Sequence, residues 1–202
     1  MASAVTAGGQ VLLTCEPGGS GAHNVAATAN LISPKAFATF TNVWAQSGFG
    51  LTDRVDVFAA YGAIRVFGQT QHYVGIASNI GVLRRSRHGL DVSLSSNVSV
   101  PLTRRDQAAT LLVTLAVIAS RPVNIGSLQL TPYGGFEAVA PVASRARGVF
   151  TPVETLHAGI VGVAIPLQKP WTAYAEYNPG PNLRSGGVGM VVTIPRRRSE
   201  VQ

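Results

Sequence analysis

Apolar and polar residues alternate along most of the chain, and the alternation is clearest between Leu90 and Val100. In this segment the even positions are apolar apart from Ser96, whereas the odd positions are all Asp, Ser or Asn. Successive side chains of a β-strand point to opposite faces of a sheet, so this period predicts a strand with one apolar and one polar face. Helical spacing is hard to find, because Gly, Pro and β-branched residues interrupt every candidate helix.

Similar segments recur along the chain, separated by residues that favour turns. If these strands close into a membrane barrel and the tight turn at 168–170 is periplasmic, the last strand ends on the periplasmic side, and a barrel with both termini on that side needs an even number of strands. Ten strands are therefore predicted, with eight as the alternative. Residues 1–20 are predicted to be a loose or plug-like segment, 21–195 the barrel and 196–202 a basic tail. The predicted strands are 23–31, 36–46, 54–67, 70–83, 90–100, 109–120, 127–139, 155–167, 171–177 and 187–194.

Composition decides which face of these strands meets solvent. Only 12% of the residues are charged, about half of the soluble average of about 25%, and Lys35 and Lys169 are the only lysines. The polar faces carry small residues such as Ser, Asn, Thr and Gly, which suit a narrow lumen better than a water-exposed surface. The sequence thus predicts a closed, antiparallel, up-and-down transmembrane β-barrel whose apolar face contacts lipid. A soluble β-barrel that binds an apolar ligand in its centre is the alternative.

The net charge of +7 raises the possibility of nucleic-acid binding, and 14 of the 16 basic residues are Arg. These residues form short clusters between apolar runs and no connected basic surface interleaved with aromatic residues. We therefore predict no nucleic-acid partner and assign the clusters to loops and to the level of lipid headgroups. The clusters are 84–87, 104–105, 145–147 and 196–198.

Two sets of side chains are candidates for function in a membrane barrel. Inward carboxylates that meet Arg54 or Arg65 would make either a charge filter in a small pore or a network that fills the barrel, and a ten-stranded barrel favours the network. Aromatic residues near strand ends are predicted to lie at the membrane interface: Trp44, Tyr61, Trp171 and Tyr174. The predicted lumen-lining residues are Arg54, Asp56, Gln71, Asn79, Asp91, Asn97, Gln129, Glu137 and Glu176.

No motif for catalysis, metal binding or cofactor binding is found. Cys15 is the only cysteine, the four histidines share no ligand spacing, and no phosphate-binding loop or nucleophile elbow is present. A hydrolase at the barrel rim is a further alternative, but Glu154 and His157 have no clear nucleophile beside them. We predict a protein that is not an enzyme, has no metal or cofactor, and has the lipid bilayer and small polar solutes as partners.

The segment from Gly50 to Phe58, followed by Tyr61-Gly62, resembles a strand–turn–strand unit of Gram-negative outer-membrane barrels. The stretch Ala173–Asn178 is similar to a penultimate strand of such barrels that leads into an external loop. The resemblance implies a small, porin-like outer-membrane protein. The chain differs from those barrels in its last residues, which are not Phe or Trp, and in a start that lacks the features of an export signal.

Overall fold

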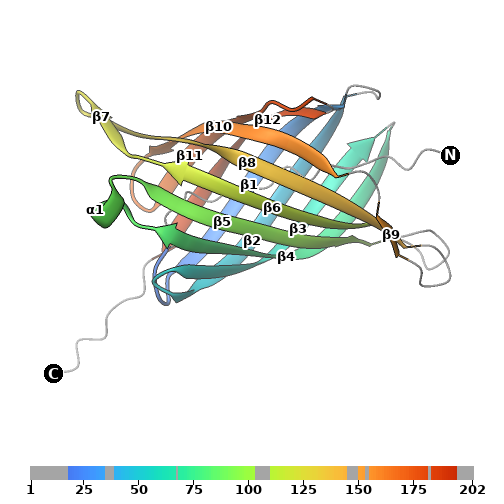
Figure 1. The fold of residues 1–202 in the computed structure, drawn as a ribbon, viewed down its shortest axis with the longest axis horizontal. Helices are drawn as coiled ribbons and strands as arrows, with labels where there is room; N and C mark the ends of the chain where they lie inside the picture. The colour runs from blue at the N-terminus through green and yellow to red at the C-terminus, as the bar shows by residue number, and fades with distance from the viewer. Residues whose placement is uncertain are drawn as a thin grey trace.

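A computed structural model shows the chain as a closed antiparallel β-barrel (Figure 1). The structure describes residues 18–34, 39–66, 68–102, 110–144, 150–152, 155–181 and 183–194. The predicted basic tail at 196–202 lies outside the described residues, as do residues 1–17 of the predicted N-terminal segment.

Ten strands of the described chain form the barrel wall, as predicted. Each strand pairs antiparallel with the next, β12 returns to pair with β1, and the pairing of β8 with β10 closes the wall. The wall strands are β1 (His23–Pro34), β2 (Phe40–Thr52), β3 (Val55–Val66), β4 (Gln69–Leu83), β5 (Asp91–Pro101), β6 (Thr110–Ser120), β8 (Leu128–Ser144), β10 (Leu156–Pro166), β11 (Trp171–Asn178) and β12 (Leu183–Ile194).

Three short elements lie outside this count. The helix α1 (Arg85–His88) connects β4 to β5. The three-residue strands β7 (Val123–Ile125) and β9 (Phe150–Pro152) both pair with β8 and lengthen its two hairpins beyond the wall. Several predicted strand ends are wrong: β8 extends five residues past the predicted end at 139, β2 continues to Thr52 and so into the predicted turn at 49–53, and β12 begins at Leu183 and not at 187.

The two ends of the barrel differ in their connections. The short turn at Asp53–Arg54, the helix α1 and the connection at 167–170 lie at one end, which we call the α1 end (Figure 1). The wall begins and finishes at this end, because His23 of β1 pairs with Ile194 of β12. This is the arrangement that an even number of antiparallel strands requires.

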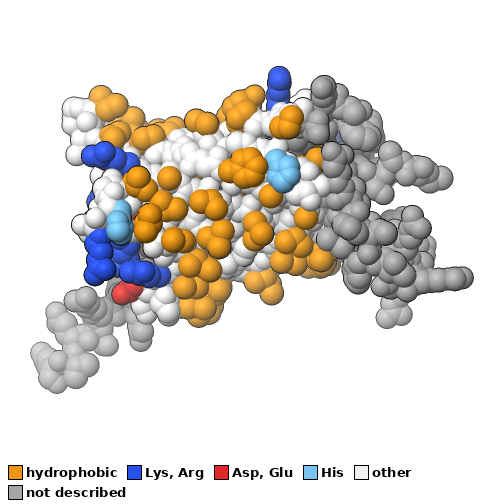
Figure 2. Space-filling view, in the orientation of Figure 1, with side chains coloured by type: hydrophobic (Ala, Val, Ile, Leu, Met, Phe, Trp, Pro, Cys, Tyr) orange, Lys and Arg blue, Asp and Glu red, His pale blue; other side chains and the backbone are white. Residues whose placement is uncertain are grey.

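The outer surface of the wall is apolar. On β5, Ser93, Ser95 and Asn97 are buried inside the barrel, whereas Leu94 and Val98 are 37% and 45% exposed on the outside. Figure 2 shows hydrophobic side chains spread over the flank of the barrel, with most of the visible Lys and Arg gathered at the α1 end. Such a surface is suited to the hydrocarbon of a bilayer and not to water. The chain is therefore a transmembrane β-barrel, and the alternative of a soluble barrel with these apolar residues in its centre is wrong.

Helices do not contribute to this assignment. Among the described residues, no helix is long and apolar enough to cross a membrane.

Replacing Leu115 with Arg tests whether the outer surface contacts hydrocarbon. Leu115 is 51% exposed in the middle of β6. Leu115→Arg should lower the free energy of unfolding by about 2–4 kcal/mol, because it places a cation against lipid. Urea titration of the barrel in lipid vesicles measures the change. Ser86→Arg on α1 is the control and should change the free energy by less than about 0.5 kcal/mol. Equal, small effects of both substitutions would contradict the membrane assignment.

Candidate functional site

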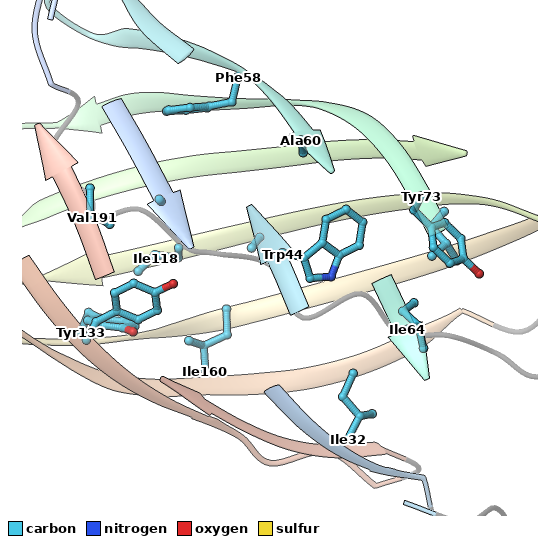
Figure 3. Close-up of a cluster of buried hydrophobic side chains, with 14 of the residues drawn as sticks. Ile32, Trp44, Phe58, Ala60, Ile64, Tyr73, Ile118, Tyr133, Ile160 and Val191 are labelled. Atoms are coloured by element: carbon cyan, nitrogen blue, oxygen red, sulfur yellow. The ribbon is translucent and has the colours of Figure 1, made fainter. Parts of the chain in front are cut away.

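The barrel interior is the candidate functional site, and it holds both aromatic and polar side chains. Figure 3 shows Trp44, Tyr73 and Tyr133 lying inside the wall with several aliphatic residues. The ring centroids of Trp44 and Tyr73 are 6.3 Å apart. The buried polar residues are Asn24, Thr28, Asn42, Gln46, Asp56, Asn79, Asp91, Ser93, Ser95, Asn97, Ser99, Thr114, Ser120, Glu137, Asn178 and Ser185.

Three inward aromatic rings lie across inward glycines of the neighbouring strand. Trp44 of β2 pairs with Gly62 of β3, and a Cβ atom on Gly62 would lie 2.5 Å from the indole ring. In the same way, a Cβ atom on Gly162 of β10 would collide with the Tyr133 ring. A Cβ atom on Gly189 of β12 would collide with the Tyr174 ring. The absence of a glycine side chain therefore lets each ring lie along the wall, as in the aromatic coverage of strand glycines.

A methyl group at Gly62 tests this packing. Gly62→Ala should lower the free energy of unfolding by about 1–3 kcal/mol, because the buried Trp44 ring must move to admit the new Cβ atom. Urea unfolding in vesicles measures the loss. Gly186→Ala is the matched control on β12, since the nearest atom to its new Cβ is the Glu176 carbonyl oxygen at 3.7 Å. If the two variants were equally stable, the proposed packing of Trp44 on Gly62 would be wrong.

Two glutamates lie inside the barrel on β8 and β11. The Asn178 side-chain amide donates a hydrogen bond of 3.0 Å to Glu137 Oε1. The Tyr133 hydroxyl donates one of 3.2 Å to Glu176 Oε2. Tyr133 reaches Glu176 across β10, because the intervening position in the register is Gly162. Gly162 thus leaves room for the Tyr133 ring, and the hydroxyl of that ring orients the Glu176 carboxylate.

Two aspartates occupy the interior near the α1 end. The Gly18 amide donates a hydrogen bond of 2.8 Å to Asp56 Oδ2, and the Asn24 side chain donates a longer one of 3.4 Å to the same oxygen. The Arg85 amide donates a hydrogen bond of 2.7 Å to Asp91 Oδ1. Backbone N–H groups thus stabilise both carboxylates without bringing a positive charge into the interior.

The described interior is acidic. Asp56, Asp91 and Glu137 are buried and Glu176 is half-buried, whereas every Arg and Lys side chain that the structure describes is exposed. The predicted contact of these carboxylates with Arg54 or Arg65 inside the barrel is therefore wrong. Arg54 lies exposed in the turn between β2 and β3, and Arg65 lies exposed near the end of β3.

The remaining predicted lumen residues lie at three kinds of position. Asn79 and Asn97 are buried inside the wall, and Asn79 Oδ1 accepts a hydrogen bond of 3.2 Å from the Ser95 hydroxyl. Gln71 is exposed near the end opposite α1, where its Oε1 accepts a hydrogen bond of 3.0 Å from the Tyr73 hydroxyl. Gln129 is exposed in the β7–β8 hairpin, beyond the wall. The prediction that Gln129 lines the lumen is wrong, because the hairpin extends past the barrel.

Two of the four predicted interface aromatics are inside the barrel. Trp44 and Tyr174 are only 4% and 6% exposed, so their assignment to the membrane interface is wrong. Tyr61 and Trp171 are exposed, and the Tyr61 hydroxyl lies 2.7 Å from His72 Nδ1 on the outer face. The alternation along the strand already indicated that Trp44 points inward, because Trp44 shares its face with the polar residues Asn42 and Gln46.

The interior offers no metal site of the usual composition. Within the part of the chain that the structure describes, no group of three or more His, Cys, Asp or Glu side chains could hold a metal ion. All four histidines are exposed.

Tyr133 and Asn178 are the partners of the interior glutamates that the sequence did not predict, although both share the inward face with them.

Comparisons with known proteins find a likeness in architecture at low sequence identity. No family model matches the chain, and the search of curated proteins gave no match. The chain is similar to the translocator domain of the autotransporter NalP from Neisseria meningitidis, with 12% identity and a TM-score of 0.47, over 86% of this chain and 88% of that one. The β-domain of the Bordetella autotransporter BrkA has 12% identity and a TM-score of 0.45, over 86% and 99% of the two chains. Neisserial surface protein A has 15% identity and a TM-score of 0.37, over 88% of this chain and 98% of that one.

Proposed function

We propose that the protein is a barrel of the bacterial outer membrane whose narrow, hydrated lumen passes small cations. The observation that carries this proposal is the acidic interior, in which four carboxylates face inward and the described basic side chains are all outside. Rings of carboxylates favour cations over anions in narrow pores. The even strand number, with both wall ends at the α1 end, supports placement in the outer membrane.

Unpaired polar atoms inside the wall support a hydrated lumen. Asn42 Oδ1, Asp56 Oδ1 and Glu137 Oε2 are among the buried side-chain atoms that have no protein partner. Buried polar atoms in proteins are paired with water when no protein group is available. Water held by such atoms, together with their oxygens, would supply ligands to a small hydrated cation.

A structural role without conduction is the second candidate, and the interior rings favour it. Trp44, Tyr73, Tyr133 and Tyr174 are all buried inside the wall. Rings that pack against each other from opposite strands would leave a path too narrow for a hydrated ion. Only a measurement of current separates this role from a cation path.

Electrical recording tests the cation path. The barrel, reconstituted in a planar bilayer under a KCl gradient, should give a small conductance with a reversal potential near that of K⁺. Replacing Asp56 and Asp91 together by Asn should move the reversal potential toward zero, because it removes the two inward carboxylates nearest the α1 end. Asp53→Asn in the exposed turn beside β3 is the control and should leave the reversal potential unchanged.

Three results would contradict the cation path. Absence of any conductance from correctly folded barrels would favour the structural role. A preference for anions would overturn the argument from the interior charges. An equal shift of the reversal potential in Asp53→Asn would show that selectivity arises from surface charge and not from the lumen.

A further inference from the structure

One cation interrupts an apolar stripe on the outer face of the barrel. The outward residues along β6 and β7 include Val117 and Ala119 before Arg121, and Val123 and Ile125 after it. On the partner strand β8, Val123 and Ile125 pair with Leu130 and Leu128, which extend the same apolar face. Arg121 is exposed directly after the last residue of β6, at the edge of the wall and between these two sets of apolar residues, where a cation without an anionic partner is unfavourable.

A cavity of about 380 Å³ lies beside this cation. Its lining consists of small or apolar residues together with one Arg, one His, one Ser and one Tyr, and no acidic residue belongs to it. The small residues face each other in the register, because Ala119 of β6 pairs with Gly134 of β8. The lining therefore combines room for an apolar group with hydrogen-bond donors for an anion. It includes His88, Leu90, Ala119, Arg121, Pro132 and Gly134.

We propose that this cavity binds the headgroup phosphate of an anionic membrane phospholipid. The guanidinium of Arg121 donates paired hydrogen bonds to the phosphate oxygens, a geometry that suits Arg. His88, at the end of α1, also lines the cavity. The first methylene groups of the acyl chains follow the outward face at Ala119 and Val117 toward the hydrocarbon.

Continuity of the surface favours a lipid over a protein partner as the occupant. The cavity is lined by the exposed, outward residues Ala119 and Pro132, and the apolar side chains on either side of Arg121 continue the outer face of the wall. The α1 end also carries exposed Arg84, Arg85 and Arg87, so the local potential attracts anionic headgroups (Figure 2). This inference rests on the transmembrane barrel and is independent of conduction through the lumen.

Lipid titration of two matched variants tests the site. Barrels in dodecyl maltoside are titrated with dioctanoyl phosphatidylglycerol in a calorimeter, and with dioctanoyl phosphatidylcholine and inorganic phosphate in parallel. Arg121→Gln should weaken phosphatidylglycerol binding by about tenfold or more, the effect of losing a charged hydrogen bond. Arg184→Gln removes an exposed Arg at the opposite end of the barrel and should change the affinity less than about twofold.

A second variant separates the cavity from its charge. Ala119→Leu fills the outer face beside Arg121 without changing any charge, and should weaken phosphatidylglycerol binding by about tenfold. Circular dichroism before each titration ensures that only folded barrels are compared, and Ala119→Leu alone decides the outcome if Arg121→Gln does not fold.

Each remaining outcome overturns the proposal in a different way. Phosphatidylcholine that binds as tightly as phosphatidylglycerol would mean that the cavity does not recognise anionic lipid. Inorganic phosphate that binds as tightly as the lipid would identify a simple anion site. Equal losses in Arg121→Gln and Arg184→Gln would indicate diffuse surface charge, and unchanged binding in Ala119→Leu would place the lipid elsewhere.

Discussion

The structure depends on a closed ladder of backbone hydrogen bonds. Within hydrocarbon no water is available to pair with N–H and C=O groups, so a sheet can cross a membrane only if it has no free edge. The pairing of β8 with β10 and of β1 with β12 meets this requirement. Closure also divides every strand into an outward and an inward set of side chains, and these two sets meet different surroundings. The outward set contacts lipid and is apolar, whereas the inward set must fill a narrow space.

That narrow space explains the glycines and small polar residues of the inward faces. A ten-stranded wall leaves little room, so the largest rings are accommodated where the neighbour across the register is small. Trp44 with Gly62, and Tyr133 with Gly162, satisfy this condition directly. The second pair has a chemical consequence, because the ring that lies over Gly162 brings its hydroxyl to Glu176. Packing and polar chemistry inside the barrel are therefore set by the same residues.

The sequence predicted the ten strands and the direction of their faces, because a period of two is a local property that each strand displays by itself. It did not predict which residues the interior brings together. Glu137 and Asn178 are 41 positions apart, and their hydrogen bond depends on a register that no local pattern encodes. Trp44 was misplaced because its position near a strand end was given more weight than its parity. Arg54 was misplaced for a different reason, since two residues of a tight turn leave the alternation altogether.

The separation of charge follows from the same geometry. A long Arg or Lys side chain inside this wall would displace the aromatic rings, whereas a carboxylate is short enough to be stabilised by backbone N–H groups, as at Asp56 and Asp91. The basic residues that the structure describes consequently lie at the barrel ends, where their side chains reach the headgroup region. Arg121 differs from the other basic residues, because it lies on the outward face with apolar neighbours on both sides. An anion from the membrane itself is the partner that both its charge and its surroundings select.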